Sequence, residues 1–231
     1  MKKILILIAI LTATYSSTYA ETGREALEAC ATAMKYDKLD SFQTQSIKAT
    51  IYIGDQRQTV KIFQKDSNLV RFETSAMGKE DAYVLTDDEF FQVKPEYEEF
   101  DVSEAGQLLQ IYEMVLPTVH SILRVPDTNI VLTISGEGDY GGKKCKKIGI
   151  SSPKTPDEIS QYVYLDAQTN WLVGIGDDKG NGLVLSSMKK VKGFVYAATI
   201  KIMKDGKKQF EIEVNSFEAN PELDDAIFAK P

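Results

Sequence analysis

The stretch Ser46-Ile-Lys-Ala-Thr-Ile-Tyr-Ile-Gly54 decides the fold class, because its side chains alternate in character. Isoleucine or alanine occupies every second position, and lysine, threonine or tyrosine lies between them. A period of two is typical of a β-strand with one buried face. Gly54-Asp55 then provides a turn, and residues 58–64 resume the alternation. The sequence therefore predicts an antiparallel hairpin here.

The same alternation continues along the chain, with turn residues at short and regular intervals. Asp205-Gly206 is the strongest of these turn signals, because this dipeptide suits a tight hairpin. Beyond the first hairpin, nine further strands are predicted, at residues 69–74, 82–85, 89–93, 130–135, 144–151, 161–165, 171–175, 194–203 and 209–217. About eleven short strands without a linker favour one twisted antiparallel sheet.

Two segments show helical periodicity instead. Thr22 and Glu25 fit a capping box, and an amphipathic pattern follows to about residue 36. Residues 104–124 carry a wide apolar face, and Pro117 is expected to break them into two helices. The sequence thus predicts a mainly β, α+β protein with helices on one face of the sheet.

The N-terminus has the features of a secretory signal peptide at residues 1–20. Lys2 and Lys3 precede an apolar run at residues 4–13, which is too short to span a bilayer, and small residues precede a cleavage point before Glu21. The alternatives are a membrane anchor or a buried helix. No cysteine lies near the cut, so we expect release without a lipid anchor, and one domain at residues 21–231.

The charge excludes one class of partner. Cleavage would remove two lysines and change the net charge from −7 to −9. So acidic a chain is not expected to bind nucleic acid. Cys30 and Cys145 are the two cysteines. In an oxidising compartment they could form a disulfide, and two buried free thiols are the equal alternative.

Motifs of catalysis are weak. Residues 136–141 match G-x-G-x-x-G, but a strand follows instead of the helix that a dinucleotide site needs, so a hairpin loop is expected. Residues 177–182 resemble the start of a calcium loop but place Lys179 at a ligand position. His120 is the one histidine. We therefore expect no enzyme, no cofactor and no metal site.

The chain resembles a known family at several places. The resemblance rests on Gln64–Glu73, which has an arginine before an aromatic residue, and on the hairpin at 83–91 with Pro95. It also rests on C-terminal segments at 193–198, 204–207, 210–217, 220–228 and 231. Together these motifs resemble the LolA-type outer-membrane lipoprotein carrier superfamily, which includes LolB, RseB and LppX.

This resemblance implies an open half-barrel of about eleven strands with a helical lid on its concave face. Acyl chains of lipoproteins, or other lipids, would bind between lid and sheet. The implied protein is a soluble periplasmic monomer that takes cargo from an inner-membrane ABC transporter to an outer-membrane acceptor. The alternative is a periplasmic lipoprotein sensor of the same fold. Because the chain stops just after the family tail, we expect the carrier.

The resemblance and the strand alternation also suggest the binding residues. Arg71 aligns with a family arginine thought to hydrogen-bond lid carbonyls and latch the lid closed. The apolar residues expected to contact the ligand come from the strands and from the lid: Ile51, Ile53, Ile62, Val70, Phe72, Phe91, Leu109, Tyr112, Leu116, Ile122 and Ile200.

Overall fold

The computed structural model describes residues 21–66 and 68–231, and the predicted signal peptide at 1–20 lies outside them. Its centre is one antiparallel sheet in the order β6-β5-β4-β3-β2-β1-β13-β12-β11-β10-β9-β8-β7. The strands are β1 (Thr44–Ile53), β2 (Gln56–Lys65), β3 (Leu69–Ala76), β4 (Lys79–Leu85), β5 (Phe90–Lys94), β6 (Glu98–Phe100), β7 (Val131–Tyr140), β8 (Lys143–Ser152), β9 (Thr155–Asp166), β10 (Leu172–Gly176), β11 (Gly182–Val191), β12 (Phe194–Lys204) and β13 (Lys207–Ala219).

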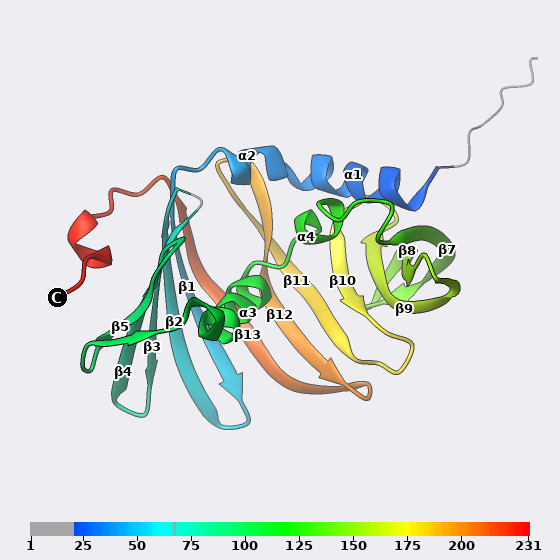
Figure 1. Cartoon of the computed structure of the whole chain (residues 1–231). Coiled ribbons are helices and arrows are strands. Elements are labelled where there is room, and N and C mark those ends of the chain that lie inside the picture. The colour runs from blue at the N-terminus through cyan, green and yellow to red at the C-terminus, as the bar shows by residue number, and fades with distance from the viewer. Residues whose placement is uncertain (1–20, 67) are drawn as a thin grey trace, which may run out of the picture.

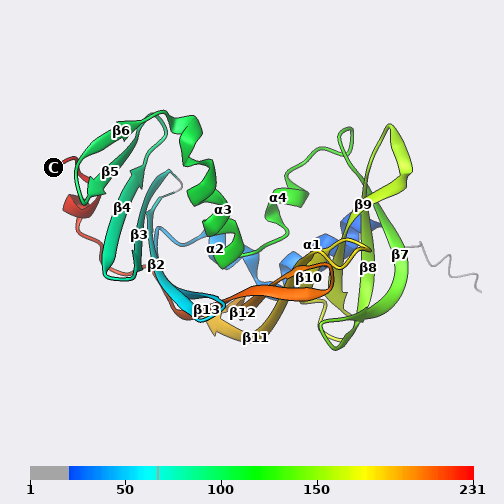
Figure 2. The same cartoon turned by 90° about the horizontal axis from the view of Figure 1, so that it is seen from below.

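The sheet is bent but not closed, because β6 and β7 form its two free edges. Figure 2 shows it as a trough, with the helices α3 and α4 lying inside. The predicted curved antiparallel sheet with a helical lid on its concave face is confirmed. A bent sheet of this kind presents two faces that can be covered independently.

Two of the observed strands are not among the roughly eleven that the sequence predicts. β6 is only three residues long and begins with two glutamates. β11 contains Ser187, whose φ of 55° interrupts the alternation, and lysines near its end. The glycine-rich segment also differs from the predicted loop, since β7 continues through Gly136 and Gly138 across a register shift.

The first helical segment closes one end of the trough (Figure 1). The predicted capping box of Thr22 and Glu25 is present at the start of α1 (Gly23–Met34). Lys35, with a φ of 61°, separates α1 from α2 (Tyr36–Asp40). Gly23 lies against the Leu132 backbone, where an added Cβ would be 2.6 Å from the carbonyl oxygen. This close approach fixes α1 on β7.

The lid comprises η1 (Val102–Ala105), α3 (Gly106–Val115) and α4 (His120–Leu123). The predicted break near Pro117 is confirmed, since α3 ends at Val115 and α4 begins three residues after the proline. Val115, Leu116 and Val119 are buried in the main core. The break therefore lets the lid dip into the trough between its two helices.

The main hydrophobic core lies on the concave face. It joins α1, α2 and the lid to inward side chains of the central strands, among them Ile47, Ile62 and Ile200. The opposite, convex face carries a separate cluster at β3–β5. This second cluster is covered by η2 (Asp225–Phe228), which lies outside the trough in Figure 2.

The cysteines are free thiols, so the disulfide alternative is wrong. Cys30 is buried in the main core next to Met34, and Cys145 belongs to a separate convex cluster. Burial raises the pKa of Cys30 to about 12, despite an opposing backbone hydrogen bond from Leu172, so its thiol is unreactive at neutral pH.

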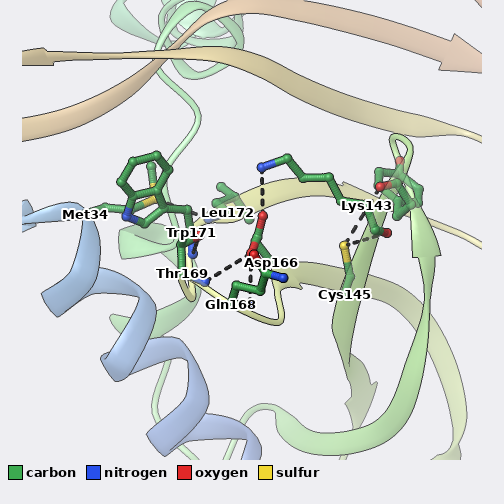
Figure 3. Close-up of polar contacts among 9 residues, drawn as sticks. Met34, Lys143, Cys145, Asp166, Gln168, Thr169, Trp171 and Leu172 are labelled. Atoms are coloured by element: carbon green, nitrogen blue, oxygen red, sulfur yellow. Dashed lines mark hydrogen bonds and ion pairs between the residues drawn. The ribbon is translucent and has the colours of Figure 1, made fainter.

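Figure 3 shows what lies between Met34 and Cys145. The Asp166 carboxylate accepts hydrogen bonds from Lys143 Nζ at 2.7 Å and from the backbone of Gln168 and Thr169. The Lys143 bond, opposed by burial and aided by the two backbone donors, lowers the pKa of Asp166 to about 2. This carboxylate fixes the β9–β10 turn beside α1.

Candidate functional site

Five incompletely buried apolar side chains cross the concave face near the hairpin ends. Ile202 pairs with Phe210 on one side and with Leu183 on the other, and Leu183 pairs with Ile175. Ile53 extends the series, because Tyr52 just before it pairs with Glu211. We call these residues the rim row: Ile53, Phe210, Ile202, Leu183 and Ile175.

The rim row differs from the neighbouring row on the same face. Ile51, Ile212 and Ile200 are at most 6% exposed. Ile53 by contrast is 53% exposed, and the other rim residues are partly buried. A run of apolar side chains left partly open across five strands is more than scattered surface hydrophobicity. It is the part of the apolar concave face that stays partly open.

The lid helix α3 also carries apolar side chains that are not fully buried. Leu109 is 42% exposed, while Leu108, Ile111 and Met114 are partly buried against the core. The open side of α3 therefore combines Leu109 with the exposed polar residues Gln107, Gln110 and Glu113.

In the described part of the chain, one side-chain hydrogen bond joins α3 to the sheet. The Tyr112 hydroxyl donates to Gln64 Oε1 at 2.9 Å. Burial raises the pKa of Tyr112 to about 12, so the hydroxyl stays protonated. A neutral hydrogen bond of this kind contributes only about 0.5–1.5 kcal/mol. This hydrogen bond alone therefore holds α3 on the sheet only weakly.

The other end of the lid is held by α1. Arg24 donates from Nη1 to the Leu123 carbonyl at 3.0 Å and from Nη2 to the Val125 carbonyl at 2.9 Å. Its guanidinium also pairs with Asp127 at 2.5 Å. Charge-assisted bonds are stronger than neutral ones. The α4 end of the lid is therefore anchored more firmly than α3.

Most of the predicted ligand residues lie on the concave side. Of these, five are fully packed, three are partly buried and two are exposed. The packed residues are Ile51, Ile62, Phe72, Leu116 and Ile200; the partly buried ones are Val70, Tyr112 and Ile122; the exposed ones are Ile53 and Leu109. Their contact with a ligand stays a prediction.

Phe91 is a wrong prediction. It pairs with Val84, which in turn pairs with Arg71 on the next strand. Phe91 is buried on the convex face with Phe228. Its neighbour Phe90 points into the trough instead, where it stacks with Tyr83 beneath the lid. Adjacent strand residues face opposite ways, so an error of one position moved the side chain to the wrong face.

The predicted lid latch at Arg71 is also wrong. Its Nη1 donates to the Ile227 carbonyl at 2.5 Å, and its Nε pairs with Glu73 at 2.9 Å. The carbonyl that it binds belongs to η2 on the convex face. Arg71 thus fastens the C-terminal segment, whereas Arg24 contacts the lid carbonyls.

Sequence analysis missed Gln64 and Arg24 as lid contacts. Arg24 lies in the first turn of a predicted helix, where an exposed arginine is ordinary. Gln64 ends a strand as the one polar residue on its inward face after Val60 and Ile62. That break in the apolar pattern was the available signal.

Two surface hollows of the described chain lie elsewhere. One, of about 410 Å³, is lined by polar and charged residues such as Lys61, Glu73 and Glu80. Within residues 21–66 and 68–231, no group of His, Cys, Asp or Glu side chains is placed to hold a metal ion. No helix in these ranges is long and apolar enough to cross a membrane. The rim row is taken as the candidate site because its apolar side chains stay partly open on the concave face.

No family model and no curated protein matches the sequence. Solved structures do resemble it. A LolA superfamily protein from Nitrosomonas europaea aligns at 10% identity and a TM-score of 0.49, over 90% of this chain and 98% of its own. A DUF1329 family protein from Desulfovibrio piger aligns at 13% identity and a TM-score of 0.45, with the same coverage. The Nitrosomonas protein is described as a member of the superfamily that the motifs of this sequence resemble.

Proposed function

We propose that this protein is an exported carrier that binds acyl chains of lipoproteins, or of another lipid, between the lid and the concave face. The observation that carries the proposal is the rim row, an apolar surface left partly open beside a weakly tied helix. Covering apolar surface gains about 25 cal/mol per Å² removed from water. An acyl chain would supply that cover.

The lid supports a carrier because its two ends are held unequally. Arg24 keeps the α4 end on α1, while α3 is tied to the sheet through Tyr112 alone among its side-chain hydrogen bonds to the described residues. Displacement of α3 would widen the trough without detaching the lid. A carrier needs such a reversible step, because cargo bound too tightly cannot be delivered.

The transport route follows from the predicted signal peptide. Export through residues 1–20 would place the carrier in the periplasm. There it would receive acylated cargo from an inner-membrane ABC transporter and pass it to an acceptor at the outer membrane. Because binding and release suffice for this role, it requires no catalytic group and no cofactor.

The test compares two adjacent exposed residues on β1. Ile53→Asp places a charge in the rim row, and Tyr52→Asp places the same charge on the opposite face. Purified wild-type protein is expected to carry lipid or acylated peptide detectable by mass spectrometry, and Ile53→Asp to lose it. Tyr52→Asp is expected to retain it. Absence of any apolar ligand from the wild type, or equal loss in both variants, would reject the proposal.

A further inference from the structure

An unusual polar side chain lies on the concave face beneath the lid. Gln45 is 6% exposed, and its inward neighbours on β1 are Ile47 and Ala49. No donor of the described residues hydrogen-bonds Gln45 Oε1, although the atom is fully buried. A buried acceptor without a partner is rare and costs free energy. Its persistence in a ligand-binding trough calls for a partner that binds there.

The surroundings of Gln45 place it next to the weak tie of the lid. On one side it pairs with Gln64 of β2, and on the other with Ala219 of β13. Gln64 accepts from the Tyr112 hydroxyl and donates from Nε2 to the Asp66 carbonyl at 3.0 Å. These neighbouring donors are thus used by other acceptors. The described residues therefore leave no donor within hydrogen-bond distance of Gln45 Oε1.

We infer that Gln45 accepts a hydrogen bond from the bound lipid, and that the trough selects lipids with a donor next to the acyl chain. The inference rests on the proposed function and specifies its ligand. Amide N–H and hydroxyl O–H groups share the required chemistry, whereas an ester offers only acceptors. Displacing Tyr112 would open access to Gln45 and free Gln64 as a second acceptor.

The experiment measures the dissociation constants of three lipids that share one acyl chain. Oleamide and oleyl alcohol carry donors, and methyl oleate does not. The wild type is expected to bind both donor lipids about three- to tenfold more tightly than the ester, as one satisfied hydrogen bond implies. A preference for only one of them would tell amide from hydroxyl recognition.

Two variants locate the effect. Gln45→Met has a similar length without the amide, so it is expected to bind the three lipids equally and to remain at least as stable as the wild type. Gln58→Met changes another glutamine on the same face, one strand away, and is expected to keep the preference. Loss of the preference in Gln58→Met but not in Gln45→Met would overturn the assignment.

The outcomes separate the two proposals. Tight binding of all three lipids with equal constants would overturn the role of Gln45 and leave the carrier intact. Preference for methyl oleate would overturn it too, because an ester has no donor for Gln45 Oε1. Failure of the wild type to bind any of the three would reject the carrier and the inference with it.

Discussion

The two faces of the β2–β5 region are covered in contrasting ways. On the concave face, α3 rests on apolar side chains and one neutral hydrogen bond from Tyr112. On the convex face, residues 220–231, here called the C-terminal cap, bury Phe228 and are held by charged groups. Arg71 binds the Ile227 carbonyl, Lys65 pairs with Asp225, and Lys230 pairs with Glu89 and Glu99.

The contrast indicates which cover can move. A packed aromatic side chain and the Arg71 contact hold the cap, and the exposed ion pairs of Lys65 and Lys230 add to them. The lid has no comparable set over α3, and it leaves Leu109 and the rim row partly open. We therefore expect the cap to be the firmer of the two covers and α3 to be displaced more easily.

The largest expected effect comes from deleting the centre of the convex cluster. Phe91→Ala removes a side chain that is 2% exposed, and should lower the free energy of unfolding by about 3–5 kcal/mol. Leu109→Ala, on the exposed side of α3, should change it by less than about 0.5 kcal/mol and weaken binding of an acyl probe. Chemical denaturation and probe titration measure both. Similar losses of unfolding free energy in the two variants would contradict the difference between the convex cluster and the exposed side of α3.

Arg71→Leu should have the next largest effect. It leaves the Ile227 carbonyl without its charged donor and the Glu73 carboxylate with Lys61 as its remaining partner, at a cost of about 1.5–3 kcal/mol. Amide hydrogen exchange should accelerate in residues 225–229 and stay unchanged in α3. The release rate of an acyl probe should equal that of the wild type. Slower release would restore Arg71 as a lid latch.

Tyr112→Phe should have a smaller effect, confined to the lid. Loss of its hydrogen bond to Gln64 should weaken closure by about 0.5–1.5 kcal/mol. Faster amide exchange in α3 and two- to tenfold faster exchange of bound probe are expected, with the cap unaffected. Tyr97→Phe, which removes a hydroxyl bonded to Glu99, serves as the control. Unchanged amide exchange in α3 would show that the Tyr112 hydrogen bond does not hold this helix on the sheet.

Acidification should produce the smallest difference in amide exchange between the C-terminal cap and the lid helix α3. Burial raises the pKa of Glu73, but hydrogen bonds and charge from Arg71 and then Lys61 outweigh it, so the pKa is lowered. The stabilisation from this pair is complete above the unfolded pKa near 4.5 and is lost as pH falls through the lowered value. Cap exchange should therefore increase below pH 4.5 before that of α3, whose tie stays neutral. Simultaneous loosening would contradict this.

The sequence was sufficient for the sheet but not for the faces of every strand. Alternation at residues 46–54 identified Ile51 and Ile53 on the concave side, and Pro117 located the break in the lid. Phe90-Phe91 could not be resolved by alternation, since both residues are apolar and each is buried on its own face. Arg71 was misassigned for a related reason: the segment that it contacts lies more than 150 residues away.

Gln45 illustrates a further limit. Its position fits an inward strand residue, but its lack of a partner depends on which groups the fold brings beneath the lid. The weak tie through Gln64 likewise arises from the way α3 crosses β2. Such relations between distant elements are set by tertiary packing, and local periodicity carries no record of them.

The most direct test of the account uses a fatty acid with a spin label on its chain, added to isotope-labelled protein. NMR signals of the rim row, Leu183 and Ile202 above all, should broaden, together with that of Leu109 on α3. Signals of Phe91 and Phe228 beneath the cap should stay sharp. Broadening centred on the convex cluster, or no broadening at saturating lipid, would contradict the assignment of the concave face as the binding site.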